Sequence, residues 1–338
     1  MPEKVDIVEI ARRAGVSIAT VSRVINNAPV VREETRRRVL EVLKSTNYRV
    51  NAVAKHLRTQ RSYNIGLIYT SVMMDFFNTI SKGVEDVARK NNYSVFFCNS
   101  SDDPVKEENY LYVLFEKRVD GIILAPTGKN AEIIQQIMGS DIPVCIIDRA
   151  VEGVDTDIVL VNNHAASKKA VDHLIEAGYR RIGFISGPRD RSNAQDRHRG
   201  YVDALREHGL AVNQDIVRYG DYTFESGYAL AEELLNGESI DALYVANERM
   251  GGGAVKRIME RGITLRKDLG FVMWDNPFWT GLIKPNITVI SQPVYTIGTT
   301  AAEMLFKRIE SRAEKEGHLV DHPIRVTLES DLIVRDSA

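Results

Sequence analysis

The chain has 338 residues, of which 44% are hydrophobic and 27% are charged, and its formal net charge is −2. This composition predicts a globular protein of two or three domains rather than a low-complexity chain. The chain has no apolar run long enough to span a bilayer, and its charged N-terminus lacks the apolar region of a secretory signal, so we expect a cytoplasmic protein.

Charge is distributed unevenly along the chain. Residues 1–62 contain 13 Lys and Arg against 6 Asp and Glu, which gives this segment a net charge of +7 and leaves −9 for the remainder. A basic segment joined to an acidic body is typical of a phosphate-binding module fused to another domain.

Residues 1–48 predict a helix-turn-helix DNA-binding head. Apolar residues at three- and four-residue spacing predict a first helix over 5–14, Gly15 ends it, and Ser17 is placed to cap a second helix over about 18–26. A third helix opens at 31–35 and continues to about Thr46. One face of the second helix is apolar and packs inward, whereas the opposite face, with Arg23 on it, can contact a partner.

Residues 49–62 form a short Ala-rich segment and a polar linker, which we interpret as a hinge. The Ala-rich part is too short to be a stable helix alone. From residue 63 the chain alternates short apolar strands with helices, a pattern typical of parallel sheets covered on both faces.

The α/β series restarts near residue 162 and predicts two similar lobes in a core that spans 63–338. The first lobe would comprise about 63–161 and 293–318, and the second about 162–292 and 319–335. Each of the two cysteines, Cys98 and Cys145, sits in an apolar stretch that predicts a buried strand. We expect them to be small core residues in a reducing compartment, and no metal or cofactor is expected.

Several segments resemble the lactose/galactose repressor family, and they occur in that family's order. They cover residues 10–26, 51–57, 120–123, 147–149, 178–188 and 291–293. The resemblance implies a dimeric bacterial transcription regulator, usually a repressor, with a periplasmic-binding-protein-like core in two lobes. A small effector would bind between the lobes and change the affinity for operator DNA.

The resemblance places the start of the second helix in the major groove, where Arg23 can donate two hydrogen bonds to guanine. Ser17 and Thr35 lie at helix starts, which suit phosphate contacts. The alternative for Arg23 is a solvated surface charge. Family positions matching Ile18 and Ala19 help to choose the operator, and here both are apolar, which favours contact with thymine methyl groups. The predicted DNA-binding residues of the head are Ser17, Ile18, Ala19, Thr20, Ser22, Arg23, Asn26 and Thr35.

In the family, the hinge folds into a helix on DNA, and the residue matching Leu57 wedges into the minor groove. A core position is the alternative for Leu57. The family usually has Pro, Arg and Ser where this chain has Val50, Lys55 and His56, and Lys55 lacks the planar fork of arginine. The predicted hinge contacts are Asn51, Ala54, Lys55 and Leu57.

Effector-binding residues are expected after the strands, because ligands of doubly wound sheets bind at the carboxyl ends of strands. Phe76 and Phe77 match family positions that stack on the effector, with helix core as the alternative, while Arg197 and Asp275 match family effector contacts. Core packing is preferred for Trp274. The predicted set is Phe76, Phe77, Asp148, Arg149, Arg191, Asn193, Arg197, Asn247 and Asp275.

Three arginines in this set favour an effector with a carboxylate or phosphate group, so a sugar acid or sugar phosphate is the leading class. Surface ion pairing is the alternative for Arg149 and Arg191. Glu248, where the family usually has Asp, and the run Gly251, Gly252 and Gly253 both suggest a reshaped pocket.

Rival functions are less consistent with the sequence. The chain has no nucleophile elbow, P-loop, dinucleotide-binding or zinc-protease motif, so it is not expected to be an enzyme. A soluble sugar-binding protein without a regulatory role would not need the basic head, and a nucleoid-type DNA binder would not need the large core. We expect a homodimer, because residues 334–338 add no apolar heptads for a tetramer-forming coiled coil. The partners expected are operator DNA, a small effector and a second copy of the chain, without a membrane.

Overall fold

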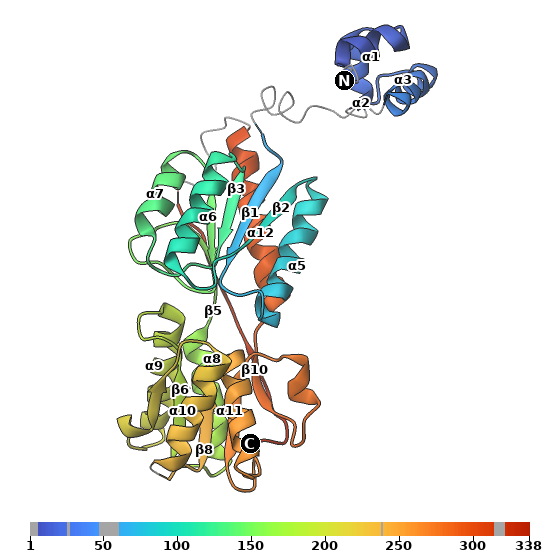
Figure 1. Cartoon of the computed structure of the whole chain (residues 1–338). Coiled ribbons are helices and arrows are strands. Elements are labelled where there is room, and N and C mark those ends of the chain that lie inside the picture. Colours follow the sequence, from blue (N-terminus) through green and yellow to red (C-terminus); the bar gives the residue numbers. More distant parts are fainter. Residues whose placement is uncertain (1–5, 26–27, 47–60, 238, 314–321) are drawn as a thin grey trace. The chain divides into compact units, whose positions relative to one another are not determined.

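The structure is a computed structural model that describes residues 6–25, 28–46, 61–237, 239–313 and 322–338. It divides into two compact units, residues 1–61 and residues 62–338 (Figure 1).

The N-terminal unit contains α1 (Ile7–Ala14), α2 (Ile18–Ile25) and α3 (Glu33–Ser45). Asp6 caps α1 by accepting a hydrogen bond from the backbone N–H of Glu9 at 2.8 Å. Gly15 ends the helix with φ of 61°, a left-handed conformation that glycine adopts without strain. The three helices share a small core of buried side chains, namely Ile10, Ala11, Ala14, Val21, Val24 and Val39.

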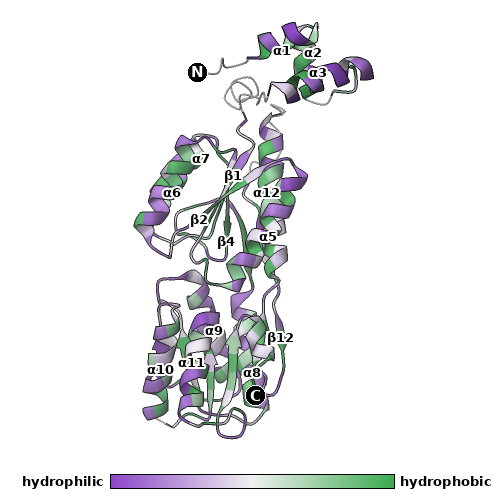
Figure 2. Cartoon of the chain, turned by 45° about the vertical axis from the view of Figure 1, so that its right-hand side comes forward, coloured by the Kyte–Doolittle hydropathy of each residue, from purple (hydrophilic) through white to green (hydrophobic). Residues whose placement is uncertain are grey.

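The larger unit contains two sheets of six strands, each covered by helices on both faces, which confirms the predicted α/β class. Figure 2 shows the strands as mostly hydrophobic and the helices as hydrophilic along part of their surface, as expected for sheets buried between helical layers. We call the sheet that holds β1 and its covering helices the first lobe, and the other sheet with its helices the second lobe.

The first lobe is an all-parallel sheet in the order β11-β5-β4-β3-β1-β2. Its elements are β1 (Asn64–Tyr69), α5 (Asp75–Lys90), β2 (Ser94–Asn99), α6 (Pro104–Glu116), β3 (Gly121–Leu124), α7 (Ala131–Gly139), β4 (Val144–Ile147), β5 (Asp157–Val161), α12 (Val294–Ala313) and β11 (Arg325–Leu328). Cys98 and Cys145 are unpaired and buried in strands of this sheet, as predicted, and burial raises the pKa of the Cys98 thiol to about 11.

The second lobe has the strand order β12-β10-β9-β8-β6-β7, in which only β12 runs antiparallel to its neighbour. Its elements are α8 (Asn163–Glu176), β6 (Ile182–Ser186), α9 (Ser192–Glu207), η1 (Gln214–Ile216), β7 (Val217–Tyr219), α10 (Phe224–Asn236), β8 (Ala242–Val245), α11 (Glu248–Glu260), β9 (Gly270–Trp274), η2 (Phe278–Gly281), β10 (Thr288–Ser291) and β12 (Asp331–Ile333).

The C-terminal segment departs from the predicted lobe boundaries. Residues 319–335 were expected in the second lobe, but β11 pairs with β5 in the first sheet and only β12 joins the second. Asp157 explains the position of β11, because its carboxylate accepts hydrogen bonds from the backbone N–H of Ile324 at 2.9 Å and from Arg308 of α12 at 2.6 and 2.8 Å. The chain therefore passes between the lobes three times, after β5, after β10 and after β11 (Figure 1).

The glycine run at the start of α11 serves helix packing. A Cβ at Gly253 would overlap the backbone carbonyl of Phe224 in α10, and one at Gly227 of α10 would overlap the backbone of Met250. These glycines therefore bring α10 and α11 together at close range, and Gly253 needs no role in reshaping the pocket.

Replacing Gly253 with alanine is expected to lower the free energy of unfolding by about 1–3 kcal/mol, because two helix backbones must separate to admit the methyl group. Gly252→Ala is the matched control, since its Cβ would lie 3.6 Å from the Phe224 ring, an ordinary contact. It should be neutral or stabilising by up to about 1 kcal/mol through helix propensity. Urea unfolding of both variants measures the difference, and equal losses would contradict the packing role.

Candidate functional site

The second helix of the N-terminal unit has one buried face and one exposed face. Val21 and Val24 are buried, while Ser17, Ile18, Ala19 and Arg23 are exposed. Ser17 begins the helix as predicted, because its Oγ accepts a hydrogen bond from the backbone N–H of Thr20 at 3.2 Å. Thr20, Ser22 and Thr35 are half-buried. The exposed face of α2 therefore presents the positive charge of Arg23 and the short side chains of Ser17 and Ala19 to a binding partner.

Five predicted DNA-binding residues lie outside the described residues, namely Asn26, Asn51, Ala54, Lys55 and Leu57. Their roles, including that of Leu57 as a minor-groove wedge, stay predictions.

A cavity of about 230 Å³ lies in the larger unit, and its lining side chains come from both lobes. Asn99 ends β2, Asp148 and Asp275 directly follow β4 and β9, and Asn247 lies two residues after the end of β8. This is the location expected for a ligand of parallel sheets. Of the nine predicted effector-binding residues, eight line the cleft: Phe76, Phe77, Asp148, Arg149, Asn193, Arg197, Asn247 and Asp275. Arg191 does not line it but pairs with Asp102, which does.

Phe76 and Phe77 in the first turn of α5 belong to the core and also line the cleft. Both are buried, and their rings pack edge to face with centroids 4.9 Å apart. Phe77 also stacks on Tyr69 at 5.8 Å. The core interpretation of this pair is confirmed, and because the same rings also give the cleft an apolar wall, stacking on an effector stays a prediction.

Arg197 of α9 is buried and held in one orientation. Its Nε donates to Asn163 Oδ1 at 2.8 Å, and its Nη1 donates to the backbone carbonyl of Ala246 at 2.6 Å. Its guanidinium lies 3.6 Å from the centroid of the Trp274 ring, a cation–π contact. Trp274 is fully buried and also donates to the Tyr244 hydroxyl, which confirms the expected core position. The Trp274 ring thus packs against the Arg197 guanidinium and helps to fix its orientation.

Asp148 and Asp275 are equivalent residues of the two lobes, each directly after a central strand. Both have positive φ, 69° and 68°, in the left-handed region that residues other than glycine seldom adopt. Backbone strain of this kind clusters at ligand sites. Asn193 of the second lobe donates to both oxygens of Asp148, at 3.2 and 3.3 Å, and so joins the lobes at the cleft.

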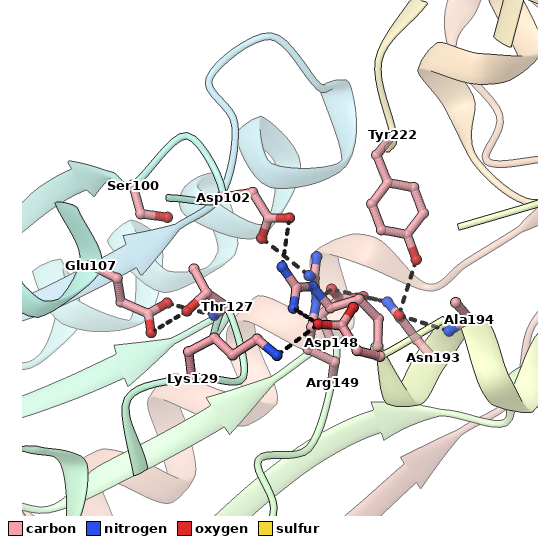
Figure 3. A network of polar contacts seen from close by, with 12 residues as sticks. Ser100, Asp102, Glu107, Thr127, Lys129, Asp148, Arg149, Asn193, Ala194 and Tyr222 are labelled. Carbon is pink, nitrogen blue, oxygen red and sulfur yellow. Dashed lines mark hydrogen bonds and ion pairs between the residues drawn. The ribbon is translucent and has the colours of Figure 1, made fainter. Parts of the chain in front are cut away.

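Arg149 in the lining of the cleft, and Arg191 beside it, are paired with carboxylates of the protein, and Figure 3 shows Arg149 next to Asp102 and Asp148. Asp102 receives hydrogen bonds from Arg149 at 3.2 Å and from Arg191 at 3.3 Å, and Arg149 also binds Asp148 at 3.0 Å. Burial is the largest single influence on Arg149 and disfavours its charged form, but the attraction of Asp148, Asp102 and Tyr222, together with the hydrogen bond to Asp148, outweighs it and raises the pKa. Neither arginine is a solvated surface charge.

Two carboxyl groups, one lining the cleft and one beside it, have raised pKa values. Burial raises the pKa of Asp275 against the attraction of Arg197, and Asp275 accepts a hydrogen bond from Gln292 at 2.6 Å. Burial and then the nearby charges of Asp275 and Asp75 raise the pKa of Glu248 from 4.5 to about 8, although backbone N–H groups at the start of α5 offset part of this. Glu248 of the second lobe thus faces the first lobe as a neutral acid at pH 7.

Glu248→Gln is expected to increase stability at alkaline pH and to have little effect at acidic pH. Below pH 4.5 the carboxyl is protonated in both states, so its titration contributes nothing. As the pH rises from 4.5 to about 8, the unfolded chain releases a proton that the folded chain retains, and the wild type loses stability, on the order of 2–4 kcal/mol in total. Urea unfolding at pH 5 and pH 8.5 measures the difference. A difference that does not grow with pH would contradict the neutral acid.

Several lining residues were not predicted. Tyr222, whose hydroxyl donates to Asn193 Oδ1 at 3.2 Å, follows the three-residue strand β7, which is too short to be predicted from periodicity. Gln292 directly follows β10. Asp102 follows a strand that was predicted, so the rule of strand ends could have found it. The other unpredicted lining residues are Thr70, Ser71, Val72, Met73, Met74, Asn99, Ser101, Asp221, Thr223 and Arg249.

Metal sites and membrane-spanning helices are both absent from the described ranges. No group of three or more His, Cys, Asp or Glu side chains among these residues is placed to hold a metal ion. None of the described helices is both long enough and apolar enough to cross a membrane.

Comparison with known proteins assigns a family to both units. Residues 6–51 match the family described as bacterial regulatory proteins, lacI family, and residues 62–329 match periplasmic binding proteins and sugar binding domain of LacI family. The chain is 34% identical to the HTH-type transcriptional regulator RegA of Clostridium saccharobutylicum over 98% of each protein. It is 32% identical to the transcriptional repressor PurR of Aliivibrio salmonicida, over 96% of this chain and 98% of that one.

Among solved structures, a complex of the transcriptional regulator CelR with cellobiose matches with a TM-score of 0.75 and 27% identity, over 99% of this chain and 100% of that one. These relatives are named as regulators and repressors, not as enzymes. The helix-turn-helix unit, the two-lobed sugar-binding fold and the matches along nearly the whole chain agree, and the chain therefore belongs to the LacI family of bacterial transcription regulators.

Proposed function

We propose that the protein is an effector-responsive repressor that binds a palindromic operator as a homodimer and changes its DNA affinity when a small sugar-type ligand binds between the lobes. The observation that carries this proposal is the cleft, because its walls come from both lobes and a ligand there contacts both at once. Such a ligand favours the lobe arrangement that it binds more tightly, by no more than the difference in its two affinities. Because the target is bacterial DNA, we place the protein in the cytoplasm.

The lining of the cleft suits a sugar. Asp148, Asn193, Arg197 and Asn247 offer both acceptors and donors to hydroxyl groups, while Phe76 and its neighbours offer an apolar wall to ring carbons. The CelR complex contains cellobiose, which supports a carbohydrate ligand. The preference for a sugar acid or sugar phosphate stays a prediction, and the ion pairs of Arg149 and Arg191 with Asp102 count against it.

A homodimer would present two helix-turn-helix units to the two half-sites of a palindrome. Both lobes have exposed apolar side chains that a second copy of this chain would cover. In the first lobe they are Phe96 and Phe97 on the edge strand β2 and Tyr112 and Val113 on α6. In the second lobe they are Met259, Phe278 and Leu282, beside an apolar groove lined by Phe224, Val255, Trp279 and Ile283. Surfaces of this kind mark protein–protein contacts.

The DNA-binding half of the proposal is tested by selecting duplexes from a random library and titrating the recovered duplex at several salt concentrations. We expect an inverted repeat and a steep negative slope of log affinity against log salt concentration. Sedimentation of the protein should give a dimer. The proposal would be contradicted if the selected duplexes shared no common sequence, or if the protein sedimented only as a monomer. Absence of DNA binding would favour a sugar-binding protein without a regulatory role.

The effector half is tested by a thermal-shift screen over sugars, sugar acids and sugar phosphates. A ligand at 100 times its dissociation constant stabilises the folded state by about 2.7 kcal/mol, which is readily measured. A panel in which no carbohydrate shifts the melting temperature would contradict a sugar-type effector.

A further inference from the structure

We propose that Asp102 is a specificity-determining residue that excludes anionic effectors, because it already supplies to Arg149 and Arg191 the carboxylate that an acidic ligand would bring. This inference rests on the proposed function, since it concerns the ligand class of the same cleft. It assigns the cleft to uncharged, polyhydroxylated ligands.

The geometry of Asp102 is that of a bound carboxylate. One oxygen accepts from Arg149 Nη1 at 3.2 Å and the other from Arg191 Nη2 at 3.3 Å, so a single carboxylate bridges two guanidinium groups. Arg149 is 4% exposed and lines the cleft, and Arg191, 9% exposed, lies against the lining residue Asp102. A ligand acid that replaced Asp102 would form charge-assisted hydrogen bonds with both arginines. Arg191 Nε is buried without a hydrogen-bond partner, so this guanidinium has donor capacity left for an anion.

The loop that carries Asp102 holds this side chain in the cleft at a conformational cost. Ser101 and Asp102 both have φ of 56°, so two consecutive residues other than glycine adopt the left-handed conformation. The loop is fixed at its base, where the backbone N–H of Asp103 donates to the carbonyl of Ser100 at 3.0 Å and Ser100 Oγ donates to the carbonyl of Tyr69 at 3.3 Å. The two arginines stabilise the strained turn by binding its carboxylate.

Asp102 also connects the lobes. It belongs to the first lobe, whereas Arg191 directly precedes α9 of the second. Lys129 of the first lobe also pairs with Asp190 of the second at 2.8 Å, and Asp190 in turn pairs with Arg191. An acidic ligand at the arginines would have to displace Asp102 and break a contact between lobes, whereas an uncharged ligand can bind beside it.

The charge of the cleft agrees with this assignment. Its lining contains three arginines, Arg149, Arg197 and Arg249, and more carboxylates than arginines. These carboxylates belong to Asp102, Asp148, Asp221 and Asp275. Asp102 and Asp148 bind Arg149, and Asp102 also binds Arg191, so the charges of these two arginines are already offset by carboxylates of the protein. Removal of the charge of Asp102 would leave excess positive charge next to the two arginines.

The test is calorimetric titration of the full-length protein with sodium sulfate and with inorganic phosphate at constant ionic strength. We expect no saturable binding by the wild type. Asp102→Asn keeps the size of the side chain and tolerates a left-handed φ, and it should bind the anion at least tenfold more tightly than the weakest binding that the wild-type titration would detect. Asp190→Asn is the matched control. It removes the same charge from a partner of Arg191 at 3.2 Å, but Asp190 is half-exposed, also pairs with Lys129 and does not line the cleft. The Asp190→Asn variant should therefore bind neither sulfate nor phosphate.

Saturable sulfate binding by the wild type would overturn the proposal, as would an Asp102→Asn variant that folds and binds no anion, or equal gains in both variants. A second measurement needs no variant: any uncharged sugar that binds the wild type should lose at least tenfold in affinity when replaced by its acid or phosphate. An acid that binds the wild type more tightly than its parent sugar would contradict the exclusion. The anion titration involves no DNA, so a failure of the regulatory function is distinguishable from a failure of this assignment.

Discussion

Arg23→Ala is expected to abolish most of the discrimination between the selected operator and unrelated DNA. Arg23 is exposed on α2, and a bidentate contact between an arginine and guanine contributes about 1–3 kcal/mol of discrimination, or roughly 5- to 150-fold. Ligand binding should not change, because the cleft is formed by the larger unit alone. Competition binding followed by fluorescence anisotropy measures the specificity ratio.

Arg38→Ala is the control for Arg23→Ala, because it removes the same charge from an exposed position of α3 in the same unit. A contact with phosphate alone would weaken binding to all sequences alike and make the salt dependence less steep. If Arg23→Ala kept the specificity ratio of the wild type, Arg23 would not read a base.

Arg197→Ala should bind operator DNA normally but lose its response to effector. The guanidinium is buried, faces the cleft and is held by Asn163, Ala246 and Trp274, so a ligand meets a donor that is already oriented. Charge-assisted hydrogen bonds contribute about 1.5–3 kcal/mol each, which predicts at least a tenfold loss of ligand affinity. Titration of ligand in the presence and absence of operator measures both properties.

Two further variants separate the geometry of Arg197 from its charge. Arg197→Lys keeps the charge but lacks the planar fork and should recover little of the response. Arg199→Ala, two residues further along α9, removes an exposed arginine that pairs with Asp196 and should respond as the wild type does. A normal response by Arg197→Ala would remove Arg197 from the ligand site.

The sequence predicted the fold well because its signals are local. Gly15 and Ser17 mark the turn between two helices, and short apolar strands alternate with helices through both lobes. The features that the sequence did not predict are either very short strands or depend on contacts between residues far apart in the sequence. β7 has only three residues, and β11 joins the first sheet through contacts of Asp157, more than 150 positions away in sequence.

At the cleft, too, the sequence predicts where residues lie but not which other residues they pair with. The end of a strand predicts that Asp148 and Asp275 lie at the cleft, because topology alone brings strand ends together. The number of arginines, in contrast, indicates an anionic ligand only if their charges are unpaired. The pairing of Arg149 and Arg191 with Asp102 depends on a loop conformation that no local pattern of the sequence predicts.

The central claim is that a molecule bound between the lobes controls the affinity of the N-terminal unit for DNA. It is tested most directly by measuring the affinity of the full-length protein for its selected duplex, at one fixed salt concentration, with and without a saturating amount of the ligand found by thermal shift. We predict a change of at least tenfold, which corresponds to a coupling free energy of about 1.4 kcal/mol. The same DNA affinity in both conditions, with the cleft occupied, would contradict the account.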